Sequence, residues 1–182
     1  MLACSTDAPS SLEQRSAPAN TVTAANAAKT AKSGPAAPKP GAAGKATAPS
    51  HGFNDAIAWR GFEEGFRVAS EEQRPLMLVV HASWCSKCRL LKRLFRSDKQ
   101  LIELSEQFVM VNVDQDEEPT VTQLGPDGTY LPRVLFFAPN GDIDSTLQNP
   151  NRRRFRYFYM PNEDLLGTMQ RALERHGGGA HS

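Results

Sequence analysis

Two cysteines three positions apart, Cys85 and Cys88, are the residues whose types and spacing best suit covalent chemistry. They follow an apolar run at residues 75–82 and precede residues 89–95, where apolar side chains recur at helical spacing. A Cys-x-x-Cys pair at a strand-to-helix junction is typical of thiol–disulfide exchange sites. The free N–H groups and the dipole of a helix start favour a thiolate on the first cysteine. The pattern therefore predicts a redox-active dithiol.

The two sulfurs are expected to have different roles. Cys85, with its sulfur exposed at the helix start, is expected to attack, and Cys88, one turn further in and more buried, to resolve the mixed disulfide. Lys87 adds a positive charge that favours the thiolate. We expect Trp84 to shield Cys85 and to offer substrates an apolar contact, with a place in the core as the alternative. No cofactor is expected beyond the redox-active pair, and no metal, because structural zinc prefers four ligands and the sequence has no second Cys pair.

Strand and helix signals alternate around this dithiol, which predicts an α/β fold: a central mixed sheet flanked by helices on both faces. Continuous apolar runs indicate buried strands, and apolar residues at helical spacing indicate helices. The last two strands are expected to form a hairpin around a Pro-Asn-Gly-Asp turn. The expected strands are residues 53–59, 76–81, 108–114, 134–138 and 143–147, and the expected helices are residues 61–72, 85–95, a short segment within 101–108, and 161–176.

The N-terminal fifty residues differ in composition from the rest of the chain. Residues 1–50 contain no aromatic residue and are rich in Ala, Pro and Lys, so we expect a disordered tether. Residues 51–178 hold every Trp, Tyr and Phe and are long enough to form one hydrophobic core. Cys4 follows Ala3 in a pattern that resembles the lipidation point of a bacterial lipoprotein, although only three residues precede it. The alternative is an incidental thiol.

Charge and hydropathy limit the classes of partner. The net charge is +1, and residues 1–50 carry five basic and two acidic residues, which leaves the remainder at −2. This balance argues against nucleic acid as a partner, although residues 152–159 mix arginines with aromatic residues. Their alternation is expected to form an edge strand instead. Because no run of about 20 apolar residues occurs, membrane attachment is expected only through a lipid on Cys4.

Further landmarks are spread through the domain. They include Gly52-Phe53, Trp59-Arg60, Pro75-Leu76-Met77, His81-x-Ser83-Trp84-Cys85, residues 108–112, Glu117-Glu118-Pro119, Pro126-Asp127-Gly128-x-Tyr130-x-Pro132-Arg133 and Tyr157-Phe158-Tyr159. Over almost all of residues 52–175 the chain resembles the thioredoxin superfamily, and within it the small endoplasmic-reticulum proteins of the thioredoxin domain-containing protein 12 and anterior-gradient type. The resemblance implies a thioredoxin fold that acts on protein disulfides. Unlike the anterior-gradient members that keep one cysteine, this chain has both.

The resemblance also implies roles for residues around the dithiol. Pro132 is expected to form a cis peptide bond beside the sulfurs, which would expose the backbone of Leu131 to an extended substrate segment. Classical thioredoxins carry a buried acid six positions before the first cysteine, where this chain has Val79. His81 and Asp114 are candidates for proton transfer in its place. The alternatives are a structural histidine and a solvated acid.

The expected setting is an oxidising compartment. Because the tether is atypical of the resembled proteins and residues 179–182 are not a Lys-Asp-Glu-Leu-type retrieval signal, we expect a bacterial envelope or periplasmic protein, with the endoplasmic-reticulum lumen as the alternative. The expected partners are proteins with thiols or disulfides, and a redox partner such as glutathione or a thioredoxin-type donor or acceptor. We expect a monomer. The alternative to catalysis is a substrate-binding or chaperone-like module.

Overall fold

A computed structural model describes residues 44–178. The expected tether up to residue 43, with Cys4, lies outside the described residues, as do residues 179–182. The elements alternate as expected from the sequence. In chain order they are β1 (Trp59–Arg60), α1 (Phe62–Glu72), β2 (Leu76–His81), α2 (Ser86–Ser97), α3 (Lys99–Ser105), β3 (Val109–Asp114), the 3-10 helix η1 (Pro119–Gln123), β4 (Arg133–Phe137) and α4 (Leu165–His176).

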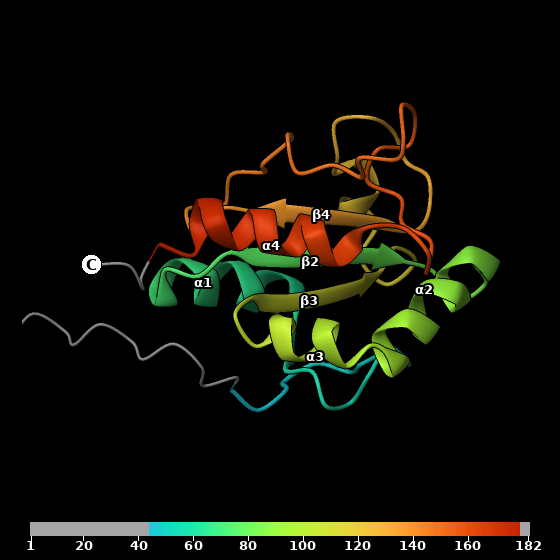
Figure 1. The fold of residues 1–182 in the computed structure, drawn as a ribbon. Helices are drawn as coiled ribbons and strands as arrows, with labels where there is room; N and C mark the ends of the chain where they lie inside the picture. The colour runs from blue at the N-terminus through green and yellow to red at the C-terminus, as the bar shows by residue number, and fades with distance from the viewer. Residues whose placement is uncertain (1–43, 179–182) are drawn as a thin grey trace, which may run out of the picture. The chain divides into compact units, whose positions relative to one another are not determined.

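The strands form one mixed sheet in the order β1-β3-β2-β4. Figure 1 shows β2 between β3 and β4. Strands β1, β3 and β2 are parallel, and β4 is antiparallel to β2. This arrangement confirms the predicted mixed sheet with helices on both faces. The two central strands, β2 and β3, are buried along their whole length, as their continuous apolar sequences predict.

Alternate side chains of β2 supply two hydrophobic layers. Met77 and Val79 pack with side chains of α2, α3 and α4 on one face. Leu76, Leu78 and Val80 pack with α1 on the other. Because the side chains of a strand point alternately to opposite faces, this register places helices over both sides of β2. The carboxyl end of β2 is thereby held firmly, and the dithiol segment follows directly after it.

Residues just before the predicted domain boundary contact the domain. The backbone N–H groups of Thr47 and Ala48 donate to the carbonyl of Trp59 at 2.9 and 3.2 Å. The side-chain amide of Asn112 donates to the carbonyl of Pro49 at 3.2 Å. The folded domain therefore begins a few residues before His51.

Two predicted strands are shorter than expected. The prediction of a strand at 53–59 was wrong except at its end, because the Asn54 side chain accepts from the N–H of Ala56 at 2.9 Å and bends the chain into a turn. The predicted hairpin is reduced to one bridge, between Phe137 and Ile143. Beyond it, the Asp144 carboxylate accepts from the Thr146 N–H at 3.0 Å and ends the pairing.

The predicted edge strand at residues 152–159 was also wrong. Tyr157 and Tyr159 are buried in alternation, but the segment forms turns and irregular structure. Its backbone groups are largely taken by other partners: the N–H of Arg156 donates to the Asp127 carboxylate at 2.6 Å, and the carbonyl of Phe158 accepts from the Asn149 amide at 2.8 Å. Alternating burial therefore arises here without a ladder of strand hydrogen bonds.

Candidate functional site: a dithiol at the start of α2

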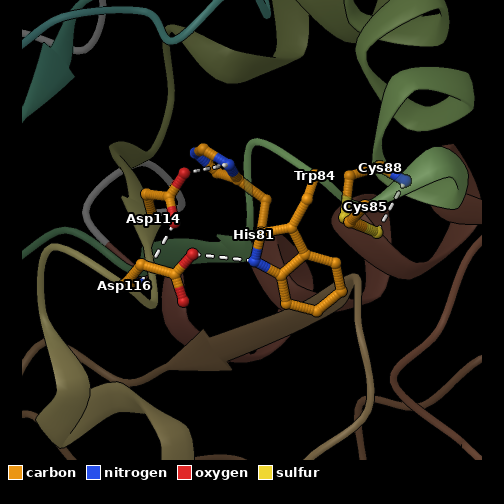
Figure 2. Close-up of a disulfide and its surroundings, with 6 residues drawn as sticks. All are labelled: His81, Trp84, Cys85, Cys88, Asp114 and Asp116. Carbon is orange, nitrogen blue, oxygen red and sulfur yellow. Dashed lines mark hydrogen bonds and ion pairs between the residues drawn. A yellow bond between two sulfur atoms is a disulfide. The ribbon is translucent and has the colours of Figure 1, made fainter.

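The two cysteines lie where β2 is followed by α2. Cys85 is the N-cap of α2, and its sulfur accepts a hydrogen bond from the N–H of Cys88 at 3.1 Å (Figure 2). The two residues form a disulfide with their Cα atoms 5.3 Å apart. The first turn of α2 contains Lys87 and no acidic residue. Helix terminus and charge therefore both favour a thiolate at Cys85 in the reduced protein.

The two sulfurs differ in their access to solvent. Cys85 has 6 % of its surface exposed, whereas Cys88 has none. The expectation that Cys88 is the more buried is borne out by these values, but Cys85 is less exposed than expected. Both cysteines pack against Ala82 and Leu131. Leu131, in the loop before β4, therefore supplies an apolar cover for the two cysteines.

A surface hollow of about 370 Å³ opens beside Cys85. It is lined by residues 84–87, Gln115 and residues 129–131, which come from three separate segments of the chain. Leu131 is partly buried, and the peptide bond between Leu131 and Pro132 is cis, as the resemblance implied. Pro132 itself is buried. The hollow therefore brings Trp84, Cys85, Lys87 and Leu131 to one surface.

Trp84 lies on the surface and not in the core. Its side chain is 64 % exposed, and its indole N–H donates to the carboxylate of Asp116 at 2.7 Å (Figure 2). The alternative of a core tryptophan is therefore excluded. Nothing in the local sequence distinguishes Asp116 from the neighbouring acids, because its partner lies 32 positions away. Asp116 fixes the orientation of a large apolar surface at the rim of the hollow.

Val79 occupies the position, six residues before Cys85, where a buried acid is the expected pattern of classical thioredoxins. Val79 is completely buried and pairs with Asn112 of β3 and Val134 of β4. His81 and Asp114 end β2 and β3 in register, with His81 Nδ1 and Asp114 Oδ2 3.8 Å apart. Figure 2 shows the imidazole turned toward Asp114. Within residues 44–178, no hydrogen bond joins either side chain to the two cysteines.

The surroundings of His81 keep it neutral. Burial lowers the pKa of His81 to about 4, and the positive charge of Lys92 acts in the same direction. Its Nε2 lies 3.4 Å from the Asn112 side-chain oxygen, and that oxygen is 2.8 Å from Nδ1 of His51. Asp114 is also buried, so the alternative of a solvated acid does not describe it. Sequence reasoning missed Asn112, because a polar residue in a buried strand gives no sign of its partners.

Between residues 44 and 178, no three His, Cys, Asp or Glu side chains are grouped so as to hold a metal. Over the same residues, no helix has both the length and the apolar character needed to cross a membrane.

The fold and the paired cysteines define a thioredoxin-like protein, and the thioredoxin-like family model matches residues 58–139. Anterior gradient protein 3 of Xenopus tropicalis is 37 % identical over 130 residues, which are 68 % of this chain and 76 % of that protein. The anterior gradient protein 2 homolog of Homo sapiens is 32 % identical over 128 residues, 69 % of this chain and 71 % of that protein. The chain belongs to the anterior gradient family of thioredoxin-like proteins.

Proposed function

We propose that this protein is a thiol–disulfide oxidoreductase that acts on protein disulfides through Cys85 and Cys88. The observation that carries the proposal is the position of Cys85: it caps α2, borders an open hollow and is bonded to a fully buried Cys88. Membership in a thioredoxin-like family supports the same chemistry. The redox-active pair is the only cofactor that the proposal requires.

In the reducing direction, the Cys85 thiolate attacks one sulfur of a substrate disulfide. The substrate S–S bond breaks, the other substrate sulfur leaves as a thiolate and takes up a proton, and a mixed disulfide forms at Cys85. The Cys88 thiol then loses its proton and attacks the sulfur of Cys85. The second substrate sulfur leaves and is protonated, so the substrate gains two electrons and the protein becomes the Cys85–Cys88 disulfide.

The reverse sequence oxidises a substrate dithiol, so the redox partner sets the direction. We propose an oxidising compartment and a partner such as glutathione or a thioredoxin-type protein. Of the two compartments, membership in the anterior gradient family favours the endoplasmic-reticulum lumen that the resemblance implies for its members. Equilibration with glutathione should give a potential of about −250 to −150 mV, within the range of known thiol oxidoreductases. A clearly lower value would indicate a dedicated reductase.

Reduction of insulin by dithiothreitol tests the catalytic proposal. The wild type should accelerate the precipitation of insulin chains, and Cys85→Ser should match the rate without protein. Cys4→Ser is the matched control and should retain full activity, because Cys4 plays no part in the proposed reaction. If Cys85→Ser were as active as the wild type, the catalytic proposal would be refuted.

One observation favours a second function, which is binding of protein segments without catalysis. The exposed Trp84 and the adjoining hollow offer an apolar contact whether or not the cysteines react. In that case, the wild type would suppress aggregation of an unfolded protein, and Cys85→Ser/Cys88→Ser would suppress it equally, with no reduction of insulin by either.

A further inference from the structure

Phe155 combines two unusual features, and its ring contacts Tyr130, which lines the hollow beside Cys85. Its side chain is 48 % exposed, and its backbone has a φ of 54°, in the left-handed region that a bulky residue rarely adopts. The positive φ costs stability in the folded chain, and backbone outliers of this kind concentrate at functional sites such as ligand contacts. Phe155 lies in the irregular segment between β4 and α4 that replaces the expected edge strand.

Hydrogen bonds join this segment, at residues 156 and 157, to Asp127 and Tyr130 of the loop that lines the hollow. Asp127 accepts from the Tyr130 hydroxyl at 2.7 Å through one oxygen and from the N–H of Arg156 at 2.6 Å through the other. The Tyr130 oxygen in turn accepts from the N–H of Tyr157 at 3.0 Å. The Tyr130 and Phe155 rings meet edge to face, with their centroids 4.9 Å apart. Tyr130 thus belongs both to the hollow and to the support of Phe155.

The charges on this segment are uneven. Arg152 is paired with Glu163, and Arg156 with Asp127. Arg153 and Arg154 are exposed, and neither forms an ion pair within the part of the chain that the structure describes. The Arg154 guanidinium lies 5.8 Å from the centroid of the Phe155 ring. The Phe155 ring, with the Arg154 guanidinium beside it, therefore adjoins the Tyr130 side of the hollow, and the exposed Arg153 precedes this pair in the chain. Asp116 borders the Trp84 side of the hollow.

We propose that Phe155, Arg153 and Arg154 form a docking surface for an acidic segment of the protein substrate. The inference rests on the proposed function and names its substrate class: proteins with aspartate or glutamate residues close to the reacting cysteine. Opposite charge across an interface raises the association rate and selects partners. Aromatic and arginine side chains are also the types that most often dominate binding energy. The Tyr130–Asp127 pair holds this surface at a fixed place relative to Cys85.

Three disulfide-linked fluorogenic peptides that differ only in charge provide the test. Each has glutamates, lysines or serines around the cysteine, and reaction with the reduced full-length protein is followed at low and high salt. At low salt the glutamate peptide should react about tenfold faster than the lysine peptide, and about 0.5 M salt should reduce that ratio to about twofold. Arg153→Glu/Arg154→Glu should reverse the order.

Arg93→Glu/Lys99→Glu is the matched control, with the same change in net charge on exposed positions of α2 and α3. It should keep the preference for glutamate. Equal reversal by the control would show that net charge decides, and would overturn the docking surface. Equal rates of the wild type with all three peptides would also overturn it. The neutral disulfide dithiodipyridine separates the two proposals: if the wild type fails to react even with this probe, the proposed function itself fails.

A second variant tests the aromatic ring. Phe155→Gly relieves the positive φ, so its thermal midpoint should be unchanged or higher than that of the wild type. Its rate with the glutamate peptide should nevertheless fall several-fold, while its rate with dithiodipyridine stays the same. An unchanged rate with the glutamate peptide would remove Phe155 from the docking surface.

Discussion

Acidification should destabilise the protein through His81. Its folded-state pKa is about 4, because the side chain is buried and faces Lys92, whereas an unfolded histidine has a pKa of about 6.5. The charge of Asp114 and the hydrogen bond that the Asn112 side-chain oxygen accepts from His81 oppose this lowering of the pKa, and His51 adds to it. Between these values the unfolded chain binds the extra proton, so the free energy of unfolding rises with pH. Stability is present above pH 6.5 and is lost as the pH falls toward 4.

The size of the effect follows from the two pKa values. Integrating the linkage relation from pH 7 to pH 5 gives a loss of about 2 kcal/mol from His81 alone. Urea unfolding of the oxidised wild type and of His81→Gln at both pH values measures it. Other groups titrate in both proteins and largely cancel in the difference, so the wild type should lose about 2 kcal/mol more than the variant.

Equal losses in the two proteins would refute this reasoning about His81. A direct measurement applies even where His81→Gln folds poorly. The imidazole C–H resonances of His81 in the wild type should show no titration above pH 5. A midpoint near 6.5 would show that the side chain is solvated or paired when charged.

Three further predictions concern the site and its support. Asp116→Ala removes the acceptor of the Trp84 indole N–H and should loosen the indole. We expect a faster decay of the Trp84 fluorescence anisotropy and a several-fold higher KM for insulin with kcat retained; unchanged values would leave the hydrogen bond without a role. Arg133→Met should lower the free energy of unfolding by about 2–4 kcal/mol, because the buried guanidinium holds the carbonyls of Val121 and Gly128, and urea unfolding would show it. Phe95→Ala should cost about 3–5 kcal/mol in the same assay, since Phe95 is fully buried on the core-facing side of the dithiol helix; a loss below 1 kcal/mol would contradict that packing.

The sequence was most informative where burial is continuous. Leu76–His81 and Val109–Asp114 are apolar runs that fit a strand covered on both faces, and both form the central pair. The dithiol helix could be predicted equally well, because an apolar stripe at helical spacing follows the two cysteines from Leu90 to Phe95. These elements place the two cysteines, so the principal chemistry of the site could be predicted.

Polar side chains that redirect the backbone could not be predicted in the same way. Asn54 and Asp144 each capture a nearby N–H and stop a strand that hydrophobic alternation favours. Arg133 is fully buried without a carboxylate partner, and it donates instead to backbone carbonyls of loops that the sequence left undefined. The same holds for Asp127 and Tyr130, whose contacts across the chain create the surface around Phe155. Local patterns do not encode such long-range partners.

The central claim is that Cys85 attacks and Cys88 resolves. Trapping of mixed disulfides tests it most directly, with Cys88→Ser and Cys85→Ser each combined with Cys4→Ser so that one thiol remains. After incubation with native insulin, whose disulfide bonds are intact, mass spectrometry should find the Cys88→Ser protein linked to an insulin chain through Cys85. The Cys85→Ser protein should remain almost entirely free, because Cys88 is buried. Equal trapping through Cys88, or none through Cys85, would contradict the account.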